Sequence, residues 1–279
     1  HHIPLRLNRE AGRGVSWHEE RTYFSYGQIV YRGQQVHLFG RCHIDRQNAM
    51  LWKDYELDGT IEVSRVTALP LQTSSRVSPG TGISSIEMLT ALREGILVPW
   101  QKQQAEMLKP AAYLFTADQG GLVYQPRIGV HKNVAEIDFV SLYPAIMVHF
   151  NISPETILPD PDAENIVPAL GLSIDTSQDG LIPKALRPLL EKRVEMKKHL
   201  ASTPHWDPYR KDFQRRSSAL KWLLVTCFGY LGYKNARFGR IEAHQAVTAY
   251  GREALLCAKE AAEDLGSRVI QLYVDGLWV

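Results

Sequence analysis

Residues 136–146 read Glu-Ile-Asp-Phe-Val-Ser-Leu-Tyr-Pro-Ala-Ile, and this stretch decides the fold that we expect. An apolar run leads into one carboxylate, Asp138, and a Ser-Leu-Tyr-Pro turn follows before the apolar pattern resumes. A strand that ends on an acid and turns under Pro144 can aim that acid at a bound cation. The N–H groups of the turn are then left to face an anion. The pattern predicts a site for Mg²⁺ and a nucleoside triphosphate; the simpler alternative is a buried strand with a solvated acid at its end.

The bulk composition is that of an ordinary globular chain with an uneven charge distribution. The 279 residues are 44% hydrophobic, carry a net charge of +2 and include three widely spaced cysteines. No run of 18 apolar residues is present, so we expect no membrane partner. Residues 184–240 contain 14 Lys and Arg against 4 Asp and Glu. This local excess favours phosphate binding, although a solvated pair of basic helices would show it too.

Hydrophobic spacing predicts mixed helices and strands. Residues 22–30 and 35–44 read as two strands around an Arg32-Gly33 turn. Residues 84–94 read as a helix with Ser84 as its N-cap. The other helices expected are 183–200, 209–228 and 241–265. Residues 269–279 read as a final strand that is interrupted only at Asp275-Gly276. The first two of these helices are joined by a short Pro-containing loop and should form an antiparallel pair.

The spelling D-x-x-S-L-Y-P at Asp138 resembles motif A of the family B DNA polymerases. The resemblance implies that Asp138 is a catalytic metal ligand. It also implies that Ser141, Leu142 and Tyr143 contact the incoming nucleotide, with Tyr143 packing under the sugar and excluding a ribose 2′-hydroxyl. The alternative is that Tyr143 is a buried tyrosine with a structural role and no contact with the nucleotide.

A second match lies in the two basic helices. Arg193 and Lys197 are four residues apart and so share one face of the first helix. Lys221 begins K-x-x-x-V-T-x-F-G, which resembles the K-x-x-x-N-S-x-Y-G of motif B. The resemblance implies that these three cations bind the triphosphate. Val225 stands where the family has Asn, and this replacement predicts altered discrimination among nucleotides.

The third match is residues 266–279, which end Tyr-Val-Asp-Gly-Leu-Trp-Val and resemble motif C, G-x-x-V-I-Y-G-D-T-D-S-x-F-V. Aligned without gaps, Asp275 is the second Asp of the motif and Tyr273 replaces the first. Asp138 and Asp275 are then the catalytic carboxylates. A register with one gap would instead make Asp275 the first Asp and Leu277 a lost ligand, which implies an inactive site.

The resemblance implies two Mg²⁺ ions, for which Mn²⁺ can substitute, about 3.5–4 Å apart. Magnesium takes much of its shell from water and from the triphosphate, so two fixed carboxylates suffice as protein ligands.

The resemblance is weaker over the first 116 residues, which look like the end of the proofreading exonuclease of the family. That activity needs a Tyr-x-x-x-Asp pair, whereas Tyr55-Glu-Leu-Asp58 is one residue short. We therefore expect no efficient proofreading. Asp45, Glu56, Asp58 and Glu62 are otherwise interpreted as surface acids.

The expected fold is α+β: an antiparallel palm sheet with packed helices, inserted antiparallel helical fingers and a partial RNase H-like exonuclease-type region at the N-terminus. The ranges expected are 1–70 for the exonuclease-like region, 71–116 for a helical connection, 117–180 and 235–279 for the palm, and 181–234 for the fingers.

The expected function is template-directed transfer of a deoxynucleotide to a primer 3′ end by a fragment of a longer polymerase. Its partners would be primer-template DNA, deoxynucleoside triphosphates and replication or repair accessory proteins, in the cytoplasm beside the nucleoid. The chief alternative is a polymerase-derived protein that binds primer-template DNA with little or no catalysis. A two-metal nuclease is the weaker alternative.

Overall fold

The computed structural model describes residues 6–10, 12–25, 28–100, 106, 108–117, 119–160 and 164–279. The chain divides into two compact units. Unit 1 comprises residues 1–85 and 196–220, and unit 2 comprises residues 86–195 and 221–279. Three helices therefore each contribute residues to both units.

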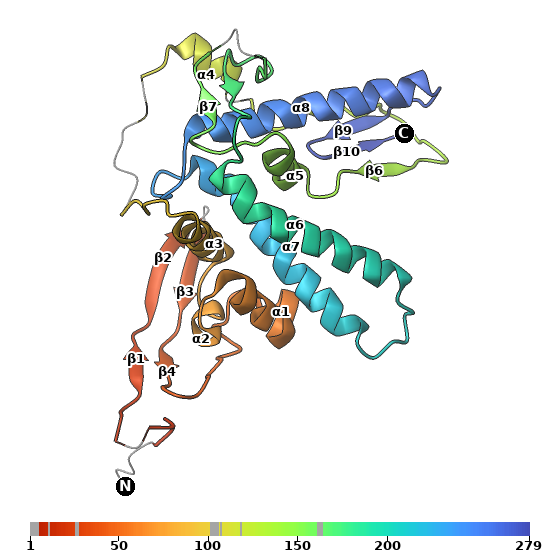
Figure 1. The fold of residues 1–279 in the computed structure, drawn as a ribbon. Helices are drawn as coiled ribbons and strands as arrows, with labels where there is room; N and C mark the ends of the chain where they lie inside the picture. Colours follow the sequence, from red (N-terminus) through yellow and green to blue (C-terminus); the bar gives the residue numbers. More distant parts are fainter. Residues whose placement is uncertain are drawn as a thin grey trace. The chain divides into compact units, whose positions relative to one another are not determined.

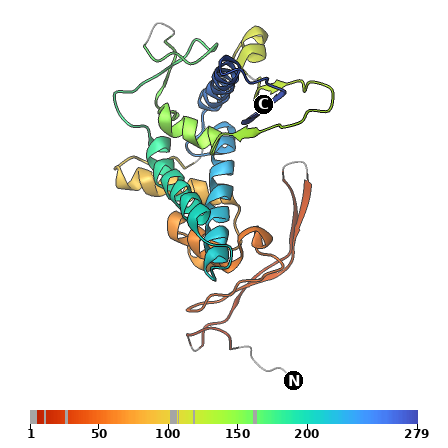
Figure 2. The same ribbon diagram turned by 90° about the vertical axis from the view of Figure 1, so that its right-hand side faces the viewer.

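The N-terminal strands form an antiparallel ribbon (Figure 2). β2 (Arg21–Ser25) pairs with β3 (Gln28–Arg32), and β1 (Ser16–His18) pairs with β4 (Gln35–His37). The predicted strand over residues 22–30 is wrong, because its two halves pair with each other. Residues 26 and 27, which connect those halves, lie outside the described residues. Arg32-Gly33 is not the hairpin turn, since β4 continues in the direction of β3 and keeps the same register offset.

Four of the eight helices that the structure describes correspond to predicted ones. The eight helices are α1 (Trp52–Thr67), α2 (Leu71–Ser74), α3 (Pro79–Arg93), α4 (Ala111–Ala117), α5 (Leu142–His149), α6 (Leu181–Ser202), α7 (Arg210–Gly232) and α8 (Ile241–Asp264). The predicted N-cap at Ser84 is wrong, because α3 already begins at Pro79. Proline fits the first turn of a helix, where its missing N–H would have no intrahelical partner.

Unit 2 contains a four-stranded antiparallel sheet. Its strand order is β5 (Val123–Tyr124), β9 (Gln271–Tyr273), β10 (Gly276–Trp278) and β6 (Glu136–Asp138). Figure 1 labels the last three of these strands. Helix α8 covers one face of this sheet. Its Leu255 packs with Val269, Leu272 and Leu277, all nearly or fully buried. A smaller antiparallel pair, β7 (Ile157–Leu158) with β8 (Ser173–Ile174), lies in the same unit.

The predicted single strand over residues 269–279 is wrong, because the chain reverses and forms the β9–β10 hairpin. Tyr273 pairs with Gly276 across the two-residue turn Val274-Asp275. Val274 has a φ of 55°, in the left-handed region that a β-branched residue rarely adopts. The predicted interruption at Asp275-Gly276 lies one residue after the observed turn Val274-Asp275, because valine is a typical strand residue and did not mark the start of the turn.

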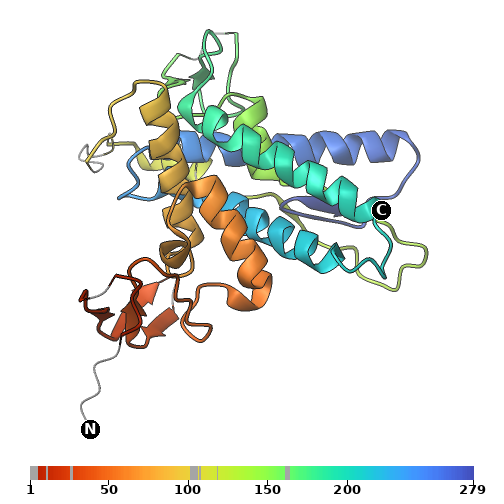
Figure 3. The same ribbon diagram turned by 60° about the horizontal axis from the view of Figure 1, so that its bottom comes forward.

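The predicted antiparallel helix pair is seen where the end of α6 meets the start of α7 in unit 1. The His199 and Phe213 rings lie 4.4 Å apart. Arg210 Nη1 donates to the Leu200 carbonyl at 2.6 Å. Figure 3 shows the short loop that joins the two helices.

A mixed helix and sheet architecture with small antiparallel sheets is thus observed. Among the described residues, no helix has the length and apolar character needed to cross a membrane. The predicted fingers, residues 181–234, are divided between the two units. Residues 196–220 belong to unit 1 and the rest belong to unit 2. The division into palm, fingers and exonuclease-like region stays a prediction.

Candidate active site

The two predicted catalytic carboxylates meet at one end of the unit 2 sheet. Asp138 is the last residue of β6 and pairs with Gly276, the first residue of β10. Asp275 immediately precedes that glycine, in the hairpin turn. The Phe139 N–H donates to the Asp275 carbonyl at 2.9 Å, which fixes the two acidic segments together. Strand β10, directly after Asp275, is therefore the neighbour of the strand that carries Asp138.

The two acids influence each other electrostatically. The pKa of Asp275 is raised, first by partial burial and then by the nearby Asp138 carboxylate. Like charges in one site disfavour simultaneous ionisation, and a cation between them would relieve the repulsion. No group of three or more His, Cys, Asp or Glu side chains is placed to hold a metal within the described ranges. The donor set is therefore a pair of hard carboxylate oxygens, which suits Mg²⁺ only with further ligands from water or substrate.

Strand pairing places Asp138 and Tyr273 on the face of the sheet away from α8. Val123, Tyr273, Gly276 and Asp138 form one row across the four strands. Directly paired residues of antiparallel strands share a face, so Tyr273 and Asp138 point to the same side. Both side chains are exposed. In the next row Leu277 is only 1% exposed and belongs to the core beneath α8.

Helix α5 begins at Leu142, four residues after Asp138, and Ser141 lies directly before it. Ser141 is the N-cap residue in a left-handed conformation with a φ of 56°. The first-turn N–H groups of an α-helix have no intrahelical acceptor, so those of Leu142 and Tyr143 are available to an anion. Arg193 of α6 donates from Nη1 to Ser141 Oγ. The half-buried Arg193 guanidinium also interacts with Asp138, which partly opposes the lowering of its pKa by burial.

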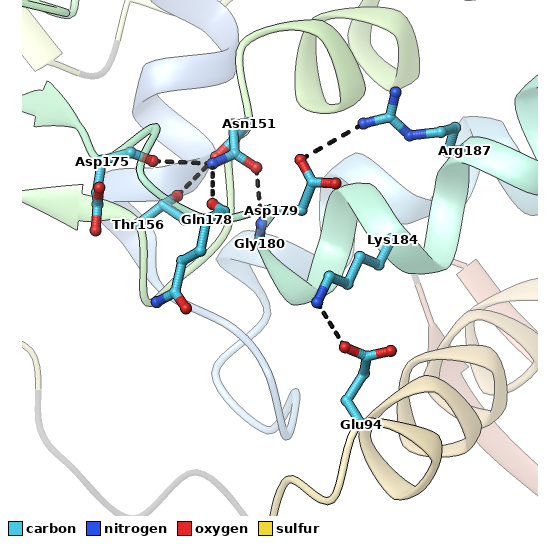
Figure 4. Close-up of polar contacts among 9 residues, drawn as sticks. All are labelled: Glu94, Asn151, Thr156, Asp175, Gln178, Asp179, Gly180, Lys184 and Arg187. Atoms are coloured by element: carbon cyan, nitrogen blue, oxygen red, sulfur yellow. Dashed lines mark hydrogen bonds and ion pairs between the residues drawn. The ribbon is translucent and has the colours of Figure 1, made fainter.

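The start of α6 is fixed by the segment that follows α5. Asn151 Nδ2 donates to the carbonyls of Asp175 and Gln178, both at 2.8 Å, and Asn151 Oδ1 accepts from the Gly180 N–H at 2.7 Å (Figure 4). The first N–H of α6, at Leu181, donates to Glu155 Oε1 at 2.6 Å. These contacts place α6, and so Arg193, beside α5.

Tyr143 is half-buried among aromatic rings. Its ring lies 4.5 Å from Phe228 of α7, and Phe228 stacks on His244 of α8 at 4.1 Å. Burial raises the pKa of Tyr143, as does the Asp275 carboxylate, while Arg252 acts in the opposite direction. Phe228 and Tyr143, which belong to two separate motif matches, are thus brought together, and His244 is a neighbour that the sequence analysis did not single out.

Two glycines make room for Tyr143. A Cβ on Gly251 would lie 3.0 Å from Tyr143 Cε1, and a Cβ on Gly121 would lie 3.1 Å from its hydroxyl oxygen. Arg252 Nη1 donates to the Gly120 carbonyl at 2.8 Å and so ties α8 to this turn. The signals in the sequence were the Gly120-Gly121 pair and a glycine inside a long helix.

The remaining predicted cations are exposed. Lys221 and Val225 lie on successive turns of α7, both exposed, and Phe228 follows on the same side of the helix. Lys197 is exposed on α6 but belongs to unit 1. The structure brings Arg193 to the acid pair, and a role of Lys197 and Lys221 in binding nucleotide stays a prediction.

The N-terminal acids are engaged in ion pairs within unit 1. Arg215 contacts Glu56 at 2.8 Å and Asp58 at 3.1 Å, and Arg216 contacts Glu62 at 2.9 Å. Glu62 is fully buried, so the interpretation of this residue as a surface acid is wrong. The hydrophobic pattern did not reveal its burial because its arginine partner lies 154 residues away.

Comparisons with known proteins define the class. The family profile described as DNA polymerase family B matches residues 80–274. DNA polymerase 2 of Saccharolobus solfataricus is 34% identical over 221 residues, which is 79% of this chain. The DNA polymerase of Archaeoglobus fulgidus is 29% identical over 248 residues, or 89% of the chain. A solved structure of the family B DNA polymerase from Pyrobaculum calidifontis is also similar, with a TM-score of 0.60, 31% identity and coverage of 80% of the chain.

This chain belongs to the family B DNA polymerases. It spans about a third of the length of these relatives, since the matches cover 33% and 30% of the two sequences and 29% of the solved chain.

Proposed function

We propose that this chain carries the catalytic part of a DNA-directed DNA polymerase that transfers deoxynucleotides to a primer 3′ end. The observation that carries the proposal is the convergence of Asp138 and Asp275 at one end of a sheet, with Arg193 beside them. In this proposal the sheet is the palm, and the α6–α7 pair is the fingers.

Asp138 and Asp275 are the residues that would hold divalent metal. Two metal ions, when bound, supply charge that activates the primer hydroxyl and stabilises the leaving pyrophosphate. The mutual repulsion of the two carboxylates supports this assignment, because it leaves negative charge at the site to be neutralised. A Cβ on Gly276 would lie 3.9 Å from Asp138 Oδ1, so the absence of a side chain at Gly276 leaves space beside that acid.

The sheet geometry supports the gap-free motif C register. Tyr273 lies in the same row as Asp138, where a family acid would face the same side of the sheet. Leu277 lies in the core row beneath α8, so an acid there would point away from Asp138. The register that keeps Asp275 as the essential second acid is therefore the one that we adopt.

The cations of the two helices are proposed to bind the triphosphate. Arg193 Nε is buried and has no hydrogen-bond partner among the described residues. Its guanidinium is thus placed to take a phosphate oxygen near the free N–H groups of Leu142 and Tyr143. Lys197 and Lys221 would add point charges. The same proposal implies primer-template DNA as partner and a location beside the nucleoid.

The test is Mg²⁺-dependent primer extension by the protein that carries this chain. Asp138→Asn and Asp275→Asn should each reduce single-nucleotide incorporation by at least about a hundredfold, because each removes charge placed for the transition state. Glu136→Gln is the matched control, since Glu136 is an exposed acid on the same strand as Asp138. Equal losses in all three variants would contradict a specific metal role for the pair.

A protein that binds DNA with little catalysis is the second candidate, favoured by the absence of a third acid among the described residues. It predicts tight primer-template binding without extension. A two-metal nuclease would instead degrade DNA without added nucleotides.

A further inference from the structure

The loop between α6 and α7, within unit 1, displays two aromatic side chains to solvent. Trp206 is 84% exposed and Tyr209 is 67% exposed. Neither takes part in the aromatic pair beneath the loop, which is formed by His199 and Phe213. Tyr and Trp are enriched at interfaces, because the apolar ring is covered by the partner while the polar end can stay hydrated.

The loop holds these aromatics in place. Arg210 Nη1 donates to the carbonyls of Leu200 and Thr203, and Asp207 Oδ1 accepts from the Tyr209 N–H at 2.7 Å. The Arg210 N–H also donates to the Asp207 carbonyl at 3.2 Å. These hydrogen bonds hold the backbone that carries Trp206 and Tyr209 in one conformation before any partner binds. Such ordering in advance lowers the conformational entropy cost of binding.

The surroundings of the loop are positively charged. Residues 196–220 contain six Lys and Arg against two Asp. Arg210, Arg215 and Arg216 are used in internal contacts. Lys198 and Lys211 are exposed and form no ion pair within the described part of the chain. The loop thus combines rigid aromatic rings with uncompensated positive charge.

We infer that this aromatic loop, defined as Trp206 and Tyr209 with Lys198 and Lys211, binds single-stranded DNA. Unpaired bases stack on aromatic rings regardless of sequence, and the lysines attract the phosphates. Duplex DNA hides its base faces and would use only the lysines. Under the proposed function, single-stranded DNA is present at every primer end, because the template there is unpaired. The inference rests on the proposed function only for this biological setting.

The test is binding of a fluorescent oligothymidine to the protein, measured by anisotropy without metal or nucleotide. Trp206→Ala and Tyr209→Ala should each weaken binding about tenfold, and Trp206→Phe should retain most of the affinity. Trp17→Ala is the control, because Trp17 is another exposed tryptophan of unit 1. Lys211→Ala should reduce the slope of log affinity against log salt by about 0.7.

Several outcomes would overturn the inference. Unchanged binding in Trp206→Ala and Tyr209→Ala would exclude stacking. Equal losses of affinity for duplex and single-stranded DNA would identify a general phosphate-binding patch. If polyglutamate displaced the oligonucleotide and Trp206→Ala had no effect on affinity, the partner would be an acidic protein. Since the measurement needs no catalysis, its failure is separate from a failure of primer extension.

Discussion

At the scale of single residues, the environment of Tyr143 explains how a half-buried ring could select a sugar. The ring is held by Phe228 on one side and by the glycines at 121 and 251 elsewhere, and Phe228 in turn stacks on His244. A ring fixed in this way cannot swing aside for an additional hydroxyl group without disturbing its neighbours.

We therefore predict that Tyr143→Ala relaxes discrimination against ribonucleotides. His244→Ala should act in the same direction but more weakly, because it acts only through Phe228. The measurement is the ratio of deoxynucleotide to ribonucleotide incorporation efficiency. Tyr250→Ala is the control, since Tyr250 stacks on Phe150 at 4.1 Å elsewhere in unit 2. A ratio that changes in the control but not in Tyr143→Ala would refute the assignment.

A second residue-scale prediction concerns the motif departures. Tyr273→Asp and Val225→Asn should each accelerate correct incorporation, by roughly tenfold if each restores about 1.4 kcal/mol of transition-state stabilisation. Leu277→Asp provides the contrast, because it places an acid in the core and should lower stability without raising the rate. If neither reversion accelerates incorporation, these departures are compensated elsewhere in the molecule.

The sequence predicted these residues unequally. Asp138, Asp275 and Arg193 could be found because motif spelling and helical spacing carry them. His244 and Arg252 could not, because their roles arise from the packing of α8 against distant elements. Glu62 shows the same limit, since only tertiary structure supplies the arginine that permits a buried acid.

At the scale of elements, long amphipathic helices were predictable and short strands were not. Helix α8 was expected over 241–265 and is found over Ile241–Asp264. The β9–β10 hairpin was predicted only as an interruption at Asp275-Gly276, because the turn begins one residue earlier, at Val274, and a valine does not suggest the positive φ found there. Such backbone strain costs about 1–3 kcal/mol and is typical of functional turns, which agrees with the place of Asp275 beside Val274.

Helix α3 carries a buried acid that makes stability depend on pH. Burial raises the pKa of Glu87 from 4.5 to about 8. The folded state then binds a proton that the unfolded state releases above about pH 4.5, so stability should fall as pH rises from there to about 8. At one pKa unit per 1.36 kcal/mol, the cost at high pH is on the order of a few kcal/mol.

Glu87→Gln should therefore match wild type near pH 5 and be more stable near pH 9. Thermal unfolding at the two pH values measures the difference. Glu260→Gln is the control, since Glu260 is an exposed acid on a helix of the same unit. A difference between Glu87→Gln and wild type that does not grow with pH would mean that Glu87 does not titrate as its burial implies.

At the scale of the whole molecule, unit 1 uses its acids to bind the α7 arginines. Glu56, Asp58 and Asp212 surround Arg215, and Glu62 receives Arg216. Glu56, Asp58 and Glu62 lie on α1 and so join it to the α7 arginines, which are distant in the sequence, whereas Asp212 pairs with Arg215 within α7. These ion pairs have a structural role. They also oppose metal binding, because the charge of a carboxylate that is paired with arginine is already compensated.

The last prediction follows from that role: Asp58→Ala should alter stability and leave mismatch removal unchanged. Loss of the Asp58–Arg215 pair should cost at most about 1 kcal/mol, because both groups are partly exposed. Excision of a mismatched primer terminus in Mg²⁺ should be inefficient in wild type and equal in Asp58→Ala and Asp45→Ala. Robust excision that either substitution abolishes would show that these acids serve a proofreading site. Asp54→Ala is the matched control, because Asp54 is an acid in the first turn of α1, the helix that carries Asp58. Stability and excision measured on the same preparations separate the two roles, since an ion pair affects only the first.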